Sequence, residues 1–470
     1  MKGDIGMENK RNSFGGSLGF VLAAAGSAVG LGNIWRFPYL AAKDGGGLFL
    51  VVYILLALTF GFALLTTEVS IGRKTKQSPL TAYSKLKSKW GFLGVLACLV
   101  PVIIMPYYCA IGGWVTKYFV IFITGHGFDA ADDEYFGGFI GTTAEPIIMM
   151  VIFLAIVAFI VFRGVNKGIE TSSKVIMPAL LLMVIAISIY SLTISHTDAE
   201  GVTRSGMDGL KVYVIPNLKD ITPGQLLKVF IDALGQLFFS LSVAMGIMIA
   251  YGSYVKDEAD LAKSINQIEI FDTIVAFLAG AMIIPAVYTF MGPEGMTKGA
   301  TLMFVSLPKV FKEMGPIGNV IGTLFFAMVL FAAITSAVSI MEAIVSSIMD
   351  KFGVTRVKAG IIEGIIALVV GVIVCLGYNV LLVKVDLPNN KGSQILDVMD
   401  YISNNCLMPV VALLTCVLIG WILKPNTIIE EVEKNGEKMG RKKLYIFMIK
   451  FVAPLFLLLL LLQTLGILNI

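Results

Sequence analysis

Charged side chains are scarce in this sequence. Asp, Glu, Lys and Arg together make up 14% of its 470 residues, whereas soluble globular domains carry about 25%. Histidine occurs only at His126 and His196, each alone in a connecting segment, so no metal site is expected. The sequence also lacks a glycine-rich phosphate loop, which argues against ATP-driven pumping. This composition excludes a soluble domain.

Cysteine is rare as well. The five cysteines lie in or near apolar segments, and no two of them form a CxxC pair: Cys98, Cys109, Cys375, Cys406 and Cys416. We interpret them as free thiols that pack as small hydrophobic side chains.

Long apolar runs dominate what is present. Hydrophobic residues make up 57% of the chain, and the mean hydropathy is +0.86. A helix needs about 20 apolar residues to cross a bilayer. Runs of this kind predict eleven membrane spans, near residues 17–41, 47–71, 92–124, 147–162, 174–194, 227–253, 264–290, 319–349, 359–383, 396–423 and 445–467.

The basic residues predict the orientation of these spans. With the N-terminus inside, the inner connecting segments hold 24 of the 36 Lys and Arg residues, as the positive-inside rule requires. These segments are 1–11, 72–90, 163–174, 254–265, 351–358 and 423–450. An odd number of spans then places the C-terminus outside.

The first span is interrupted in its middle. It reads GSAVGLGNIWRFP from Gly26 to Pro38, so that Gly30, Gly32 and Asn33 loosen the helix and Arg36 follows within one turn. An irregular backbone at membrane depth is tolerated only where it is buried in protein or lines a cavity. We therefore predict a binding site at the bilayer midplane.

The sixth span carries a similar break, SLSVAMG at residues 240–246. Spans 1 and 6 each begin a unit of five spans, and because five is odd the second unit enters the membrane from the opposite side. This pattern predicts an all-α polytopic fold with a 5+5 inverted repeat, in which both first helices are broken. The alternative is that each break is a kink or a patch of closely packed small residues.

Several motifs resemble those of the neurotransmitter:sodium symporters, in particular the bacterial amino-acid transporters with eleven spans. They follow the family's order: GSAVGLGNIWRFP (26–38), YY (107–108), RGVNKGIE (163–170), GQLFFSLS (235–242), TSAVSIM (335–341) and LDVMD (396–400). The resemblance implies a leucine-transporter-like fold. Its expected parts are a cytoplasmic segment (1–16), a first repeat (17–194), an extracellular loop (195–226), a second repeat (227–423), and a cytoplasmic loop with the eleventh span (424–470).

The resemblance also implies two sodium sites built from carbonyl, hydroxyl, amide and carboxylate oxygens. Site 1 would use Ala28, Asn33, Ser240 and Asp272. Site 2 would use Gly26, Val29, Ala332, Thr335 and Ser336. For the two hydroxyls of site 2, the residues alone leave open ordinary hydrogen bonding to the carbonyl four residues earlier.

Asp272 stands out because an unpaired carboxylate within a span is costly and marks a functional site. Many members of the family carry Asn here and use chloride to balance sodium. Tyr53, Gln236 and Ser240 match chloride-site positions, but the serine expected one turn after Asp272 is Ala276. We expect that the carboxylate replaces the anion and that chloride is not required.

Gly30 stands where monoamine carriers of the family have Asp, so the substrate should bring its own carboxylate. The residues implied to bind it are Ala28, Leu31, Gly32, Ile104, Tyr108, Phe239, Ser240, Ser242, Met245, Ser336 and Ile340. Leu31 occupies space that longer amino acids need, and the apolar wall favours a hydrophobic L-amino acid. The family's Gly-x-Gly is Ala244-Met245-Gly246 here, and the extra methyl group disfavours indole-sized side chains.

The resemblance further implies gates on both sides of the substrate. Arg36 and Asp400 match the outer pair, with Tyr108 and Phe239 beneath it as a thin lid. Arg11, Tyr254 and Asp350 match the inner network, with Phe14 as an apolar plug. The alternative for each pair is a surface ion pair, worth less than about 1 kcal/mol.

Gly168 and Pro178 lie ten residues apart around the start of span 5. Bacterial relatives with this spacing can unwind the helix there, which lets water reach the second sodium from inside. The alternative is a static kink.

These observations predict a sodium-coupled symporter that imports a hydrophobic L-amino acid by alternating access across the plasma membrane of a bacterium. Its partners would be the amino acid, two sodium ions and the lipid bilayer, without nucleic acid. A sensor or regulatory subunit that binds the same ligands without net transport is the alternative, although intact gates argue against it. A proton-coupled exchanger of the same fold would lack the hydroxyl pair of span 8. No enzyme is expected, because no catalytic constellation lies within the spans.

Overall fold

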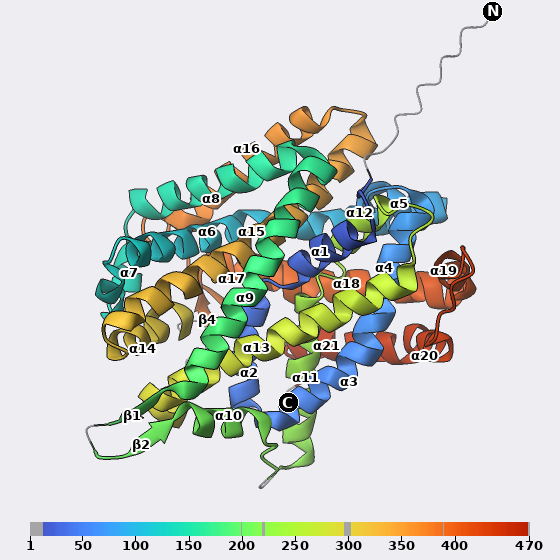
Figure 1. Ribbon diagram of the computed structural model, residues 1–470. Helices are drawn as coiled ribbons and strands as arrows, with labels where there is room; N and C mark the ends of the chain where they lie inside the picture. Colours follow the sequence, from blue (N-terminus) through green and yellow to red (C-terminus); the bar gives the residue numbers. More distant parts are fainter. Residues whose placement is uncertain (1–12, 199, 219–220, 296–301, 389, 469–470) are drawn as a thin grey trace, which may run out of the picture.

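A computed structural model describes residues 13–468 of the chain, except residues 199, 219–220, 296–301 and 389. The described part is almost entirely helical (Figure 1). Two short antiparallel hairpins accompany the helices: β1 (Ser195–Thr197) pairs with β2 (Thr203–Ser205), and β3 (Val385–Leu387) pairs with β4 (Asn390–Ser393). The expected all-α polytopic class is thus confirmed.

The first half of the chain forms the first five expected spans. Span 1 consists of α1 (Ser17–Ala28), a π-helical turn (Gly32–Arg36) and α2 (Phe37–Lys43), and span 2 of α3 (Gly47–Leu56), a second such turn (Ala57–Gly61) and α4 (Phe62–Thr75). Spans 3 to 5 are α6 (Gly91–Ile123), α8 (Ala144–Phe162) and α9 (Thr171–Thr193), the last preceded by the π-helical turn η5 (Val165–Glu170). Shorter helices connect them: α5 (Pro79–Leu86), α7 (Tyr135–Gly141) and α10 (Gly206–Val214).

The second half begins with another broken helix. The expected sixth span appears as α11 (Pro223–Ser240) and α12 (Ile247–Ser253). The long helices that follow are α13 (Leu261–Gly295), α15 (Pro316–Phe352), α16 (Arg356–Leu376), α17 with α18 (Ile395–Asp400, Met408–Val417), and α20 with α21 (Lys442–Phe447, Ala453–Thr464). Two further connecting helices are α14 (Leu307–Glu313) and α19 (Asn426–Val432).

The number of spans agrees with the prediction except at the sixth. Within the described residues, nine helices are long and apolar enough to cross a membrane, and α1 with Gly32–Lys43 forms a tenth span bent by 52°. The pair α11 and α12 falls outside that set, because the break between them, from Ser240 to Ile247, is longer than the break in span 1. The expected ninth span also ends early: α16 stops at Leu376, where the Gly377 N–H bonds back to the Ile373 and Val374 carbonyls and a turn begins.

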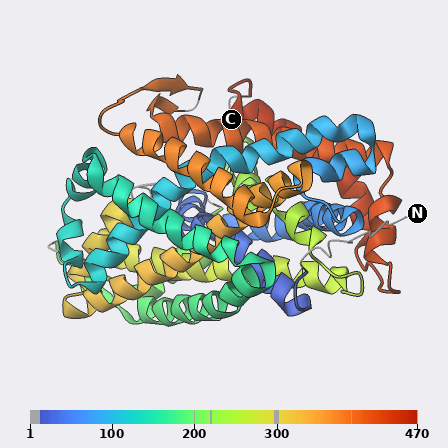
Figure 2. The ribbon, with the colours of Figure 1, turned by 90° about the horizontal axis from the view of Figure 1, so that it is seen from above.

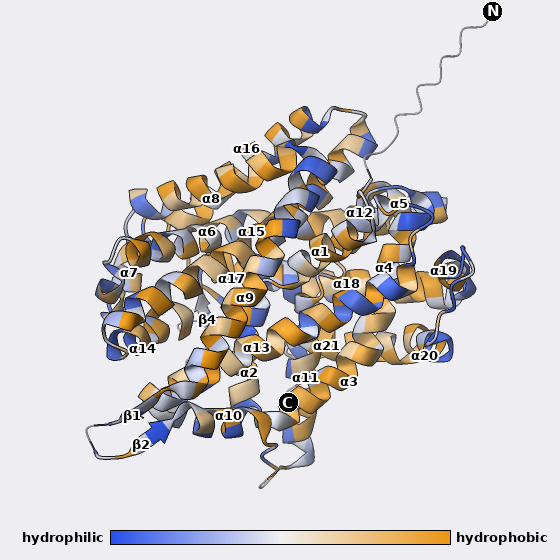
Figure 3. Cartoon of the chain, viewed as in Figure 1, coloured by the Kyte–Doolittle hydropathy of each residue, from blue (hydrophilic) through white to orange (hydrophobic). Residues whose placement is uncertain are grey.

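The helices pack into one bundle whose outward surface is apolar. Helices α3, α8 and α16 are hydrophobic along most of their length, while hydrophilic residues gather around α5, α19 and β2 (Figure 3). We call the face that holds the start of α1, α5 and α19 the N-terminal face, and the face that holds α7, α10 and β1–β2 the opposite face (Figure 1). Helix α1 lies inside the bundle against α9, α13 and α15, as the turned view also shows (Figure 2).

Ion pairs hold the segment between α18 and α20 against the N-terminal face. The Arg73 side chain at the end of α4 is fully buried, and its Nε donates to Glu431 Oε1 of α19 at 2.8 Å. Its Nη1 donates to the Ala259 carbonyl at 2.7 Å. Arg441 binds Glu269 of α13 at 2.7 Å. Spans 2, 7, 10 and 11 are therefore joined at this face.

Candidate functional site

The break in span 1 occurs where the backbone approaches neighbouring helices most closely. Helix α1 ends at Ala28, and Val29 has a non-helical ψ of 89°. A Cβ on Gly30 would lie 2.6 Å from Ser336 Oγ, and one on Gly32 would lie 2.9 Å from the Phe239 ring. Larger residues at either position would displace span 8 or span 6. The glycines thus permit the contact between the broken helix and its neighbours.

The break in span 6 is a left-handed stretch of backbone. Ser242, Ala244 and Gly246 have φ angles of +52°, +62° and +72°. A residue with a Cβ in this region costs about 1–2 kcal/mol, so the surroundings must hold it. The Ala244 N–H donates to Glu68 Oε1 of α4 at 2.6 Å, and both residues are buried.

Glu68 is a site residue that our sequence analysis missed. It lies within span 2 in the run TTEVS, and an intramembrane carboxylate was the available signal. The two breaks also contact each other directly, because Ser242 Oγ donates to the Ser27 carbonyl at 3.0 Å and Ser27 Oγ donates to Ser242 Oγ at 3.1 Å. The breaks in spans 1 and 6 therefore meet at one place.

A small cavity lies between the two breaks. Every residue that the resemblance implied for substrate binding lines it: Ala28, Leu31, Gly32, Ile104, Tyr108, Phe239, Ser240, Ser242, Met245, Ser336 and Ile340. Ser27, Gly30 and Asn33 complete the lining. The Tyr108 hydroxyl is buried and has no hydrogen-bond partner among the described residues. The cavity is mainly apolar with a few polar groups, as small-molecule sites are.

The side chains expected at sodium site 1 converge from three spans. Asn33 Nδ2 donates to Asp272 Oδ1 at 2.7 Å, and Ser240 Oγ lies 2.9 Å from the same oxygen and 3.0 Å from Asn33 Oδ1. Tyr53 donates to Asp272 Oδ2 at 3.4 Å. All four side chains are buried, and Ala28 lies in the same cavity wall. A carboxylate, an amide and a hydroxyl oxygen within hydrogen-bond distance suit a small hard cation.

The residues expected at sodium site 2 lie where α1 meets α15. Ser336 Oγ donates to the Ser27 carbonyl at 3.1 Å, so this hydroxyl reaches across to span 1. Thr335 Oγ1 instead donates to the Phe331 and Ala332 carbonyls of its own helix, at 3.1 and 3.0 Å. Gly26 packs against Thr335, since a Cβ there would be 3.3 Å from the Thr335 Cβ. Val29 and Ala332 are fully buried beside them.

The expected outer pair is not in direct contact. Asp400 Oδ1 accepts from the Tyr107 hydroxyl at 3.1 Å and from Asn404 Nδ2 at 2.5 Å. Arg36 lines a separate polar pocket on the side of the opposite face, together with Asp232, Phe239 and Asn404. The structure therefore adds Tyr107 and Asn404 as neighbours of Asp400, which the sequence analysis did not anticipate.

On the N-terminal face, Phe14 is buried beneath the start of α1. Its N–H donates to the Tyr254 carbonyl at 3.1 Å, and its ring packs edge-on against Tyr251 and Tyr254. The Tyr254 hydroxyl donates to Glu342 Oε1 at 2.6 Å, and Arg356 binds Glu342 with both Nη atoms.

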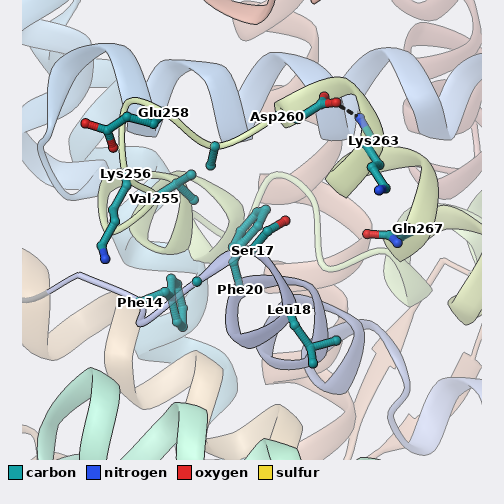
Figure 4. Close-up of a pocket in the computed structure, with 12 residues that line it drawn as sticks. Phe14, Ser17, Leu18, Phe20, Val255, Lys256, Glu258, Asp260, Lys263 and Gln267 are labelled. Atoms are coloured by element: carbon teal, nitrogen blue, oxygen red, sulfur yellow. Dashed lines mark hydrogen bonds between the residues drawn. The ribbon is translucent and has the colours of Figure 1, made fainter. Parts of the chain in front are cut away.

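The remaining residues of the expected inner network are placed as follows. Asp350 accepts the Ser78 N–H at 2.7 Å, while Arg11 lies outside the described residues. Glu342 and Arg356 were not anticipated. A pocket beside Phe14 opens between the start of α1 and the connection of α12 to α13, where charged side chains such as Lys256 and Lys263 line it (Figure 4). This pocket is separate from the cavity between the two breaks.

The start of span 5 departs from a regular helix. The turn η5 (Val165–Glu170) is π-helical and includes Gly168, and Pro178 lies inside α9. A proline within a helix removes a backbone donor. The structure thus shows an irregular turn at Gly168, while the unwinding of span 5 stays a prediction.

The sequence and the structure of the chain are both similar to those of known proteins. The model of the sodium:neurotransmitter symporter family matches residues 11–130 and 138–469. The chain belongs to this family. The uncharacterized sodium-dependent transporter YhdH of Bacillus subtilis is 34% identical over 472 residues, which cover 98% of this chain and 99% of YhdH.

Two further relatives are similar over their whole length. An uncharacterized sodium-dependent transporter of Haemophilus influenzae is 31% identical, over 96% of this chain and 97% of that protein. The crystal structure of MhsT in complex with L-phenylalanine superposes with a TM-score of 0.83 at 33% identity, over 97% of this chain and 100% of MhsT. The predicted fold and class are thereby confirmed: this symporter-family chain is a sodium-dependent membrane transporter with the fold of MhsT, and not an enzyme.

Proposed function

We propose that this transporter carries a hydrophobic L-amino acid into a bacterial cell together with sodium ions. The observation that carries the proposal is the cavity between the two helix breaks, which combines polar groups, including the unpaired Tyr108 hydroxyl, with an apolar wall. Alternating access would close the cavity in turn at the opposite face and at the N-terminal face.

The polar end of the cavity suits an α-amino acid. Gly30 leaves no side-chain carboxylate to meet an amine, and Ser336 fills the space a side chain would need. The buried Tyr108 hydroxyl is free among the described residues to donate to the substrate's carboxylate. The amine would meet carbonyl groups of the broken helices. Such charged contacts are stronger in a dry site than in water.

The other end of the cavity suits a hydrophobic side chain. Ile104, Phe239, Met245 and Ile340 line it, and Met245 can adapt to several shapes because methionine is flexible. The related MhsT holds L-phenylalanine. The Ala244 methyl group in the left-handed turn favours side chains smaller than indole.

The oxygens described above support two sodium sites. At site 1, Ala28, Asn33, Ser240 and Asp272 would hold an ion next to the substrate's carboxylate; the ion would supply positive charge there. At site 2, Ser336 already reaches a span 1 carbonyl, and Thr335 would turn from its own helix to the ion together with the Gly26, Val29 and Ala332 carbonyls.

Chloride would not be required, because Asp272 already places a negative charge at site 1. Its carboxylate contacts Asn33, Ser240 and Tyr53, which leaves none of these side chains free for an anion. Ala276, one turn further along α13, is buried and has no hydroxyl to offer.

The N-terminal face would lie in the cytoplasm and the opposite face outside. Arg36 and Asp400 would close over the substrate from outside, and Phe14 with the Tyr254–Glu342–Arg356 network would seal the inside. The positive-inside rule supports this orientation.

A screen of the twenty amino acids by thermal shift, with and without sodium, followed by uptake into proteoliposomes, tests the proposal. We expect stabilisation by hydrophobic L-amino acids only when sodium is present, and accumulation driven by an inward sodium gradient. Binding without counterflow would indicate a sensor instead of a transporter.

A further inference from the structure

Glu170 is a buried carboxylate that none of the proposed sites uses. It ends the turn η5 at the start of span 5, and 3% of its side chain is exposed. Its Oε2 accepts the Gly15 N–H at 2.7 Å and the Asn166 amide at 3.3 Å, and its Oε1 accepts Lys174 Nζ at 2.7 Å. Asn166 and Lys174 belong to the same stretch of chain, whereas Gly15 leads into α1. The carboxylate therefore joins span 5 to span 1.

The backbone of α1 is shaped to receive this carboxylate. A Cβ on Gly19 would overlap the Glu170 carboxyl group, and one on Gly15 would lie 3.0 Å from its Oε1. A Cβ on Gly16, between these two positions, would meet nothing within 4 Å. The backbone thus contacts Glu170 closely only at Gly15 and Gly19 and not at Gly16. The contact depends on the absence of a side chain at Gly19.

The turn that carries Glu170 is itself a weak helix. A side chain at Gly168 would overlap the Ile160 carbonyl oxygen, so glycine is required there. Ser172 Oγ donates to the Gly168 carbonyl at 2.8 Å, which gives that carbonyl a partner outside the helical ladder. Single π-helical turns occur frequently at functional sites, and glycine weakens a helix through its conformational entropy.

We propose that Glu170 is a positioning residue that couples the unwinding of residues 165–170 to the release of α1 from the N-terminal face. When η5 unwinds, the Glu170 backbone moves and Gly15 loses a charge-assisted hydrogen bond. When α1 moves first, a buried carboxylate loses a donor, which favours the unwound turn. The coupling is reciprocal, as it must be between two sites of one molecule. The inference rests on the proposed function, because both movements belong to opening toward the cytoplasm.

Amide hydrogen exchange of the purified full-length protein tests the coupling. In Glu170→Ala, and separately in Gly19→Ala, exchange should rise about tenfold or more both in residues 165–170 and in α1, since a hydrogen bond to a charged group is lost. Glu170→Gln, which keeps the size and one acceptor, should give a smaller rise at the same two segments. Gly16→Ala is the matched control and should leave exchange unchanged.

The double variant Glu170→Ala, Gly19→Ala distinguishes coupling between the two segments from a general loss of stability. Gly19→Ala should add little to Glu170→Ala, because the carboxyl group that the new methyl displaces is already gone. Equal effects of Gly19→Ala with and without Glu170, or a rise in only one of the two segments, would overturn the proposal. Exchange is measured without a sodium gradient, so a lack of sodium-driven uptake by the wild type would refute the proposed function and leave the coupling standing.

Discussion

Asp272 contacts Asn33, Ser240 and Tyr53 at the proposed sodium site 1, and its charge predicts how uptake depends on anions. If the carboxylate balances sodium, uptake into proteoliposomes should be complete in gluconate. Asp272→Asn keeps an oxygen ligand but removes the charge, so it should lose most activity. Adding Ala276→Ser should make the residual uptake rise with chloride. A wild-type protein whose uptake collapses without chloride would contradict this account.

Thr335 and Ser336 allow a test of the second sodium site. In the proposal their hydroxyls bind an ion and contribute little to packing. The double variant Thr335→Ala, Ser336→Ala should therefore stay folded and lose sodium-driven uptake. Helix content by circular dichroism and uptake are measured together. Survival of both would mean that these hydroxyls only bond to backbone carbonyls, as Thr335 does in this structure.

Asp44, at the opposite face, should make the stability of the protein depend on pH. Burial, together with the nearby Asp232 carboxylate, raises the pKa of Asp44 to about 7. The folded protein therefore binds a proton that the unfolded chain has released, and the thermal midpoint should fall as the pH rises from about 5 to about 8. Asp44→Asn should remove this part of the fall. An exposed control, Asp132→Asn, should leave it unchanged.

At the level of single residues, the sequence predicted which side chains line the cavity but not all of their partners. Gly30 and Gly32 could be recognised because glycine weakens a helix and because Asn33 and Arg36 follow them within the same span. Glu68, Tyr107 and Glu342 were missed, because their roles depend on backbone and side chains far away in the sequence. The separation of Arg36 and Asp400 likewise depends on how spans 1 and 10 pack against each other, which no local pattern records.

Among the helical elements, we expect the break in span 6 to limit the size of the substrate's side chain. Ala244 holds φ of +62° with a methyl group that this region disfavours. Ala244→Gly should relax the turn that carries Met245 of the cavity wall, so that tryptophan competes better for uptake of a smaller amino acid. Ala250→Gly, in the regular helix α12, is the control and should lower stability by about 1 kcal/mol without changing the competition. Equal competition by tryptophan in wild type and Ala244→Gly would rule out this role.

Helix positions were predictable because hydrophobic length alone defines a membrane span. The end of α16 was not, since Leu376 is followed by a turn whose flanking residues are still apolar. The bend of 52° in span 1 could be located but not measured from the sequence. Its size follows from contacts with α13 and α15, which are made by residues hundreds of positions away.

At the scale of the whole molecule, we expect the binding of sodium and the binding of substrate to be thermodynamically linked. One ion would touch the substrate's carboxylate, so each ligand must strengthen the binding of the other by the same factor. Removing sodium should weaken amino-acid binding tenfold or more, which is about 1.4 kcal/mol. Isothermal titration in sodium and in choline measures this factor. An unchanged affinity in choline would contradict the sodium assignment.

The buried pair of Arg73 and Glu431 has a consequence for how the chain is made. The two residues are 358 positions apart, so at about 5–20 residues per second the ribosome finishes Arg73 roughly 20 to 70 seconds before it reaches Glu431. During that interval the end of span 2 at the N-terminal face carries a guanidinium that cannot yet be buried with its partner. A buried charge without its partner is strongly destabilising. This contact therefore cannot form until synthesis is nearly complete, and we expect that a chain that stops before α19 is less stable and is degraded faster than the full-length protein.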